Sequence, residues 1–278
     1  CGNCPHLNEY PRLFFDTSHF LWERKREVYR RCADRLVFVS PSQWLKEKLE
    51  RSPLAGAFRC EVIPTAVDCG VFTKGDHVQA RNRLNIGEDE RVIMFSSFKL
   101  NDPRKGLHGF KDAVHALGER LQQPLTVLLV GGHTGDIVFR EGIKVVQTGS
   151  IRDDVRLAEC YNAADIYCSL SEADNLPNTL IEAAACGVPV ITFDCGGCRE
   201  AVKDRETGYA VGDDAAMVEA AAALLKDTLK REEFSSSARA WAENTFSMQQ
   251  QVTRYSALAR ELTESAYEAA VDTEKVAV

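Results

Sequence analysis

The alternation of short apolar runs with amphipathic segments between residues 91 and 211 restricts the fold of this sequence more than any other feature. Apolar runs of strand length occupy 91–98, 125–132, 143–149, 165–170, 189–194 and 208–211. The stretches 105–123 and 153–164 carry apolar residues at helical spacing. Continuous apolar strands that alternate with helices are typical of a parallel sheet covered on both faces. We therefore predict an α/β fold with a Rossmann-like parallel sheet.

The sequence on either side of this block has a weaker pattern. Residues 34–40 and 60–68 are strand-like, and residues 42–52 have helical spacing. We interpret the polar, glycine-containing stretch 69–77 as a linker. Three helical stretches follow residue 213. A strand–helix–strand unit before the block and a helical end after it are therefore expected.

Charge and hydropathy argue against two broad classes of protein. The net charge is −7, which disfavours a general nucleic-acid binder but allows a local basic site. No apolar run approaches the roughly 20 residues that span a bilayer. The start of the sequence shows no basic region followed by an apolar one, as a secretion signal would. We expect a cytoplasmic protein without a nucleic-acid partner.

The ten cysteines are expected to be reduced, because the chain is long and shows no secretion signal. Cys1 and Cys4, and likewise Cys195 and Cys198, have the spacing of metal ligands, but a structural zinc site usually needs four ligands. The glycines between Cys195 and Cys198 favour a tight turn. The first pair is at most half of a site, so we assign no metal.

Ligands of open parallel sheets bind beyond the carboxyl ends of the strands, and one loop there is rich in candidates. In SEADNLPNTLIE, Pro177 suits the first turn of a helix that Asn175 or Asn178 can cap. Free amide groups near Asn178 and Thr179 would then form an anion site that suits a diphosphate. Glu182, one turn further, can accept hydrogen bonds from a ribose diol. A capped helix with solvated acids explains the same spacing equally well.

A second loop, SFKLNDPRKG, places cations at the same edge of the sheet. Lys99, Arg104 and Lys105 follow a buried strand and can neutralise a diphosphate leaving group. Asp174, in the first loop, can accept hydrogen bonds from sugar hydroxyl groups. The alternative is a basic helix entrance, which the helix dipole disfavours.

Two further loops give weaker signals. VGGHTGD lacks the spacing of a dinucleotide-binding motif, although Gly132 is a candidate contact for the ligand that binds at this edge. In TGSIRDD, Ile151 can lie against the edge of a flat base. An ordinary turn before a helix capped by Asp153 is an equally good interpretation of that loop.

Together these loops resemble the C-terminal, donor-binding half of the GT-B glycosyltransferases, in particular the large retaining family 4. The likeness runs from about residue 34 to residue 265. Its strongest part is the E-x7-E motif, here DNLPNTLIE from Asp174 to Glu182, followed by AAACGVPVI. Three other segments, CGGCREAVKDRETGYAV, KLNDPRKG and VIPTAVDCGVF, are similar to family motifs. The combination is far more specific than any single motif.

The resemblance implies roles by position. Asp174 would contact the donor sugar, and Lys99 and Lys105 the diphosphate, which makes these three the candidate catalytic residues. Glu182 would bind the ribose. Backbone contacts to the donor would come from Asn175, Leu176, Asn178 and Thr179. Three residues depart from the family: Asp174 is one methylene shorter than Glu, Lys99 lacks the planar fork of Arg, and Pro177 has no N–H.

The resemblance also predicts domains and activity. Residues 1–72 would be the remnant of an acceptor-side domain with its linker, 73–245 the donor-binding domain, and 246–278 a C-terminal helix and tail. We expect a metal-independent, retaining hexosyltransferase that uses a UDP- or GDP-type sugar and no cofactor. A glycan or lipid-linked acceptor and peripheral association with the inner face of the membrane are implied by the bacterial surface-polysaccharide subgroup. Nucleotide-sugar binding without transfer, and a nucleotide-sugar epimerase, stay open as alternatives.

Overall fold

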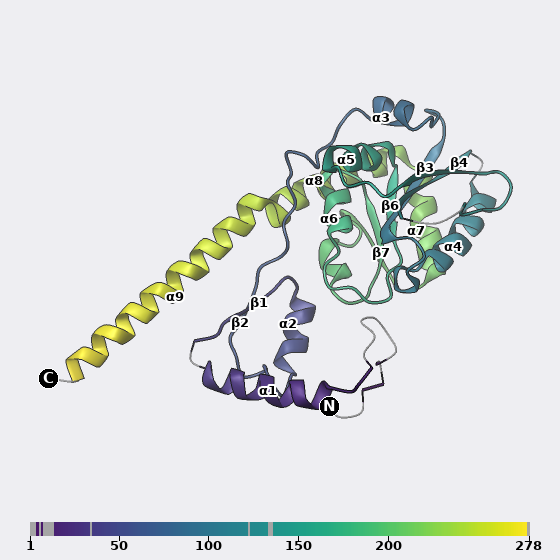
Figure 1. Cartoon of the computed structure of the whole chain (residues 1–278). Helices are drawn as coiled ribbons and strands as arrows, with labels where there is room; N and C mark the ends of the chain where they lie inside the picture. The colour runs from purple at the N-terminus through teal and green to yellow at the C-terminus, as the bar shows by residue number, and fades with distance from the viewer. Residues whose placement is uncertain are drawn as a thin grey trace. The chain divides into compact units, whose positions relative to one another are not determined.

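The computed structural model describes residues 4, 5, 7, 14–33, 35–121, 123–132 and 136–276, with side chains as far as residue 264. The chain divides into two units, Cys1–Val62 and Ile63–Val278. Figure 1 shows the elements of both units. No helix in the described part of the chain combines the length and apolar character needed to cross a bilayer.

The first unit contains a two-stranded parallel sheet and two helices. Its elements are α1 (Ser18–Arg31), β1 (Phe38–Ser40), α2 (Gln43–Glu50) and β2 (Cys60–Val62). The rings of Tyr29, Phe38 and Phe58 meet edge to face, with centroids 5.5–5.7 Å apart. These ring contacts hold α1 against β1.

The second unit is built on a six-stranded parallel sheet in the order β5-β4-β3-β6-β7-β8. Its strands are β3 (Arg91–Lys99), β4 (Leu125–Gly132), β5 (Ile143–Gly149), β6 (Ile166–Ser169), β7 (Val190–Phe193) and β8 (Gly208–Val211). Its α-helices are α3 (His77–Arg83), α4 (Leu107–Arg120), α5 (Asp154–Ala163), α6 (Asn178–Ala185), α7 (Asp214–Lys226), α8 (Thr228–Phe246) and α9 (Met248–Val276). Two 3-10 turns, η1 (Pro103–Lys105) and η2 (Cys198–Ala201), complete it. The predicted α/β fold with a parallel sheet is confirmed.

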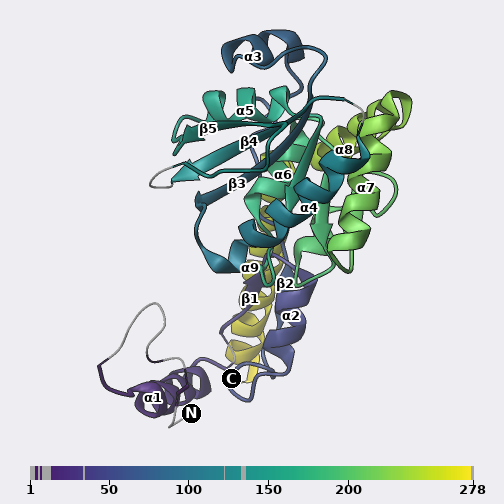
Figure 2. The same ribbon diagram turned by 90° about the vertical axis from the view of Figure 1, so that its right-hand side faces the viewer.

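Helices cover both faces of this sheet, as Figure 2 shows for α4 and α7 on one side and α5 and α6 on the other. Strand β3 alternates between the two cores that result. Val92 and Met94 lie in the core with α5 and α6, whereas Ile93 and Phe95 lie in the core with α4 and α7. All four side chains are at most 1% exposed, which explains why residues 92–95 are all apolar instead of alternating with polar residues.

The order of the strands creates a topological switch point between β3 and β6. From β3 the chain builds outward through β4 to β5, and it then returns to place β6 on the other side of β3. β3 and β6 pair at only two positions, Ile93 with Ile166 and Met94 with Tyr167. In open parallel sheets, ligands bind beyond the carboxyl ends of strands at such a point.

Some predicted elements differ in extent. The runs 34–40 and 60–68 contain strands of only three residues each, and Pro64, which has no N–H for a ladder, follows β2 closely. The helix predicted over 105–123 begins at Leu107, because Gly106 has a left-handed backbone with φ of 74°. The charged sequences of α1 and α3 have no regular apolar stripe, and neither helix was predicted.

The stretch 69–77, interpreted as a linker, makes extensive contacts with the rest of the second unit. Phe72 is 5% exposed and belongs to the core that contains α5 and α6. Arg239 on α8 donates hydrogen bonds to the carbonyl oxygens of Phe72 at 2.7 Å and Cys69 at 3.0 Å. These contacts fix the conformation of the stretch against the six-stranded sheet of the second unit.

Candidate functional site

The loops that follow β3, β6 and β7, which we call the switch-point loops, hold one another in place at the carboxyl edge of the sheet. The amide of Glu172 donates to the carbonyl oxygen of Arg104 at 3.2 Å. The amide of Gly197 donates to the carbonyl oxygen of Asp174 at 3.0 Å. Three segments that are distant in the sequence therefore form a single cluster at the switch point.

Two glycines allow the close approach of these loops. Gly106 has a φ of 74°, and a Cβ atom there would lie 2.1 Å from the carbonyl oxygen of Leu170. Gly196 has a φ of 55°, and a Cβ atom there would lie 2.1 Å from the carbonyl oxygen of Asp174. No side chain can occupy either position without displacing the neighbouring loop.

Lys105 and Asp174 are brought together across the switch point. The Lys105 Nζ atom lies 2.5 Å from Asp174 Oδ2, and both side chains are half-buried. Lys105 lies in η1, before the start of α4 at Leu107, so the unfavourable dipole effect expected of a basic helix entrance does not act on it directly. The neighbouring Arg104 is exposed and forms an ion pair with Asp102 instead.

Lys99 and Gly132 end neighbouring strands at the same edge. They are register partners in the pairing of β3 with β4. The Lys99 side chain is exposed, while Gly132 is half-buried. The structure thus places a second cation at the carboxyl edge of the sheet.

Helix α6 begins at Asn178, and Pro177 occupies its N-cap position. The sequence suggested Asn175 or Asn178 for that position, and neither residue occupies it. The ring of Pro177 offers no hydrogen-bond acceptor. The amide groups of the first turn, where Asn178 is exposed and Thr179 is half-buried, have no partner within the helix, and such groups attract anions.

Glu182 lies one turn into α6, half-buried below this first turn. The Tyr161 hydroxyl group donates a hydrogen bond to its Oε2 atom at 2.8 Å. Burial raises the pKa of the Glu182 carboxyl group, the hydrogen bond from Tyr161 opposes that shift, and the nearby Asp154 adds to it. The Tyr161 contact could not be predicted from the sequence, because Tyr161 has the helical spacing of an ordinary core residue.

The remaining candidates contribute less. The Leu176 side chain is 6% exposed and lies in the core, so only its backbone is available to a ligand. Ile151, in the loop after β5, is half-buried against the same core. Asn175 is half-buried, and its backbone amide donates to Asp174 Oδ1 at 3.0 Å.

The second cysteine pair forms a turn, as predicted. The Cys198 amide donates to the carbonyl oxygen of Cys195 at 3.1 Å, and both thiols are free. Cys1 lies outside the described residues, so the suggestion that it forms half of a metal site with Cys4 stays a hypothesis. Within the described ranges, no three His, Cys, Asp or Glu side chains are grouped so that they could hold a metal ion.

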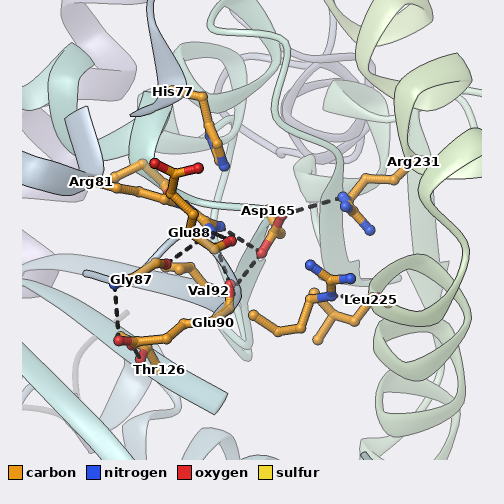
Figure 3. Close-up of polar contacts among 12 residues, drawn as sticks. His77, Arg81, Gly87, Glu88, Glu90, Val92, Thr126, Asp165, Leu225 and Arg231 are labelled. Carbon is orange, nitrogen blue, oxygen red and sulfur yellow. Dashed lines mark hydrogen bonds and ion pairs between the residues drawn. The ribbon is translucent and has the colours of Figure 1, made fainter. Parts of the chain in front are cut away.

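A separate charged cluster, which the sequence did not reveal, lies at the amino ends of the strands (Figure 3). Arg81 on α3 is 1% exposed and reaches Asp165 Oδ2 at 2.8 Å. Arg231 on α8 lies 3.3 Å from Asp165 Oδ1, and the Val92 amide donates to Oδ2 at 2.8 Å. A cavity of about 280 Å³ lies beside this cluster, lined in part by Lys74, His77 and Ser235. We call Arg81, Asp165 and Arg231 the amino-edge triad.

Comparisons with known proteins agree with the fold. The family model described as Glycosyl transferases group 1 matches residues 89–227. A D-inositol 3-phosphate glycosyltransferase of Actinosynnema mirum is 32% identical over 198 residues, which cover 64% of this chain and 45% of that protein. The chain therefore spans less than half the length of this relative.

Two solved structures share the fold at low sequence identity. Sucrose-phosphate synthase from Thermosynechococcus elongatus has a TM-score of 0.73 and 22% identity, covering 91% of this chain and 65% of that one. Anabaena Alr3699/HepE in complex with UDP and glucose has a TM-score of 0.66 and 21% identity, covering 90% of this chain and 69% of that one. With the family model matching half of its residues, the chain belongs to the family Glycosyl transferases group 1.

Proposed function

We propose that this chain is the donor-binding part of a glycosyltransferase that moves a hexosyl group from a nucleoside-diphosphate sugar to a hydroxyl acceptor, with retention and without a metal ion. The observation that carries the proposal is the Lys105–Asp174 pair, 2.5 Å apart, at the switch point where α6 begins. A cation, a carboxylate and free helix amides at one edge suit a ligand that combines phosphates with hydroxyl groups.

In this proposal the diphosphate lies against the first turn of α6, near Asn178 and Thr179. Lys105 exchanges its carboxylate partner for a phosphate oxygen, and Lys99 supplies a second positive charge. Together they stabilise the charge that develops on the leaving nucleoside diphosphate. Asp174, released from Lys105, accepts hydrogen bonds from the sugar. A single ammonium group can therefore serve both partners in turn.

The nucleoside half of the donor extends along α6 and toward the loops after β4 and β5. Glu182 accepts from the ribose hydroxyl groups, and Gly132 and Ile151 line the approach of the base. The presence of UDP in the structure of Anabaena Alr3699/HepE, which shares this fold, supports a UDP-type donor, with GDP as the next candidate. No further cofactor is required for this chemistry.

A panel of nucleotides tests the proposal directly. Calorimetry with UDP-, GDP- and ADP-sugars and with free uridine should show micromolar binding of one nucleoside diphosphate sugar and much weaker binding of the nucleoside. Equal affinity for uridine and UDP would contradict the placement of the diphosphate. Turnover that persists in a chelator, with a product of unchanged anomeric configuration by NMR, would support the metal-free, retaining reaction.

A second candidate function is donor binding without transfer, which is favoured by the fact that the match covers only 45% of the Actinosynnema mirum protein. Turnover separates the two functions. If the chain binds the donor tightly but transfers no sugar to a panel of glycan, lipid-linked and inositol phosphate acceptors, it acts as a binding module. Transfer to any of these acceptors would identify it as an enzyme by itself.

We further propose that the first unit associates with the inner face of an anionic membrane, where a lipid-linked or glycan acceptor would be held. Helix α1 buries none of its residues, and it carries five Lys or Arg and only two Glu in a chain whose net charge is −7. Phe14, Phe15 and Phe20 are 99%, 80% and 62% exposed. Exposed aromatic side chains beside basic ones suit the headgroup region of anionic lipids.

Sedimentation with vesicles checks the membrane proposal. The chain should bind vesicles rich in phosphatidylglycerol and not those of phosphatidylcholine alone, and added salt should weaken binding. Replacing Phe14 and Phe15 by Ser should reduce binding about tenfold, since each loses a large apolar surface. Leu229→Ser, on an equally exposed site of α8, is the matched control and should bind as the wild type does. Dimerisation through α1 without vesicle binding would contradict the proposal.

A further inference from the structure

A chain of hydroxyl groups lies beneath the switch point and reaches Glu182. The Tyr161 hydroxyl donates to Glu182 Oε2 at 2.8 Å and also contacts the Ser96 side chain. The Tyr167 hydroxyl lies 3.0 Å from the Ser96 Oγ atom and also contacts the Thr179 side chain. These residues come from α5, β6, β3 and α6, so the network joins both sides of the switch point.

Tyr161 has no freedom to place its hydroxyl group elsewhere. Its side chain is fully buried, and its ring packs edge to face against Tyr167, 5.6 Å away, and Phe72, 6.2 Å away. Loss of the hydrogen bond to Glu182 would leave the buried O–H donor without its carboxylate acceptor, which is unfavourable. The ring packing and this penalty together fix the hydroxyl group at Glu182.

This contact makes the two oxygens of the Glu182 carboxylate inequivalent. Oε2 is occupied by the buried Tyr161 hydroxyl, while the residue itself is only half-buried. An ionised carboxylate accepts hydrogen bonds through both oxygens, so Oε1 keeps its accepting capacity for a ligand. Because Tyr161 fixes the plane of the carboxylate, the direction of that remaining acceptor is also fixed.

We propose that Tyr161 is a positioning residue that orients Glu182 to accept from a vicinal diol, and that it thereby makes the site selective for ribonucleotides over 2′-deoxyribonucleotides. The inference rests on the proposed function and adds to it the residue that sets sugar selectivity. A carboxylate free to rotate would satisfy a single hydroxyl group nearly as well as a diol, so the fixed geometry is the source of selectivity.

The protonation of Glu182 gives a second consequence. Glu182 is faced by Tyr161 and Asp154 from α5, by Tyr167 from β6 and by Cys186 from its own helix. Burial and Asp154 raise the pKa of its carboxyl group, and the Tyr161 hydrogen bond lowers it. Removal of that hydroxyl should therefore raise the pKa further, and the loss of diol binding on acidification should begin at a higher pH.

Calorimetry with UDP and 2′-deoxy-UDP between about pH 5 and pH 8 tests this inference. The wild type should bind UDP about tenfold more tightly than the deoxy analogue, since a hydrogen bond to a charged group is involved. In Tyr161→Phe the preference should fall to about threefold or less, and the acidic loss of affinity should move to higher pH. Tyr209→Phe removes a tyrosine hydroxyl on β8, outside the network, and should keep both properties.

The outcomes separate this inference from the proposed function. If the wild type binds UDP and Tyr161→Phe keeps the wild-type preference and pH profile, the role of Tyr161 is overturned while donor binding stands. If the wild type binds no nucleoside diphosphate, both are overturned. If Tyr161→Phe does not fold, Glu182→Gln decides: it should bind UDP without the acidic transition, and an unchanged transition would overturn the inference.

Discussion

Both edges of the sheet in the second unit carry a carboxylate paired with cationic side chains. The carboxylate is buried at the amino edge and half-buried at the carboxyl edge. At the amino edge, Asp165 is buried between Arg81 and Arg231 and also accepts from the Val92 amide. At the carboxyl edge, Asp174 has Lys105 as its ionic partner, and both side chains are half-buried.

The difference shows how a structural ion cluster can be told from a binding site. Arg81 also donates from Nη1 to the carbonyl oxygens of Glu88 at 3.0 Å and Glu90 at 2.9 Å, so the protein itself satisfies its guanidinium group. At the switch point, by contrast, Lys105 retains donors beyond the one used on Asp174, and the first turn of α6 presents amide groups that have no partner within the helix. Charges that the protein satisfies fully stabilise a fold, whereas charges with remaining capacity bind ligands.

The largest expected effect concerns the amino-edge triad. Asp165→Ala leaves Arg81 buried without its counter-charge, and burial already lowers the pKa of Arg231. The free energy of unfolding should fall by about 3–5 kcal/mol, measured by urea denaturation. Asp165→Asn keeps an acceptor for the Val92 amide and should lose less. UDP affinity of the protein that remains folded should be unchanged; a specific loss of affinity would mean that the two edges are not separate in function.

A smaller effect is expected at the carboxyl edge. Lys105→Ala should weaken UDP binding about tenfold and uridine binding hardly at all, because in the proposed function the lost charge binds the diphosphate. Its unfolding free energy should change by no more than about 1 kcal/mol, as is usual for partly exposed ion pairs. The matched control is Arg104→Ala, since Arg104 is exposed and pairs with Asp102. Equal losses in both variants would indicate a diffuse basic surface rather than a site.

The smallest effect on stability is expected for Glu182→Gln, together with a clear loss of UDP affinity. Because burial raises the pKa of Glu182, its neutral form stabilises the fold below its unfolded pKa of about 4.3. That stability is lost as pH rises through the higher folded value. At neutral pH the Gln variant should therefore be as stable as the wild type or slightly more so, by thermal unfolding. A marked loss of stability would instead place Glu182 among the structural charges, with Asp165.

Local sequence patterns predicted most of the fold of the second unit. Runs of buried residues such as those of β3 and β4 identified the strands, and their continuous apolar character predicted a sheet covered on both faces. The same patterns placed Lys105 and Asp174 beyond strand ends, so that both could be predicted to lie at one edge. The roles assigned to these residues by resemblance stay predictions.

The sequence alone determined most of the strands and helices of the second unit, because apolar period and turn residues act over a few neighbours. The tertiary structure decided which distant groups meet: Lys105 rather than Arg104 with Asp174, Tyr161 with Glu182, and Arg81 of a short, charged helix with Asp165. These contacts depend on the order of the strands and on how closely the crossovers pack, here through Gly106 and Gly196. Neither property is set by any one stretch of the chain.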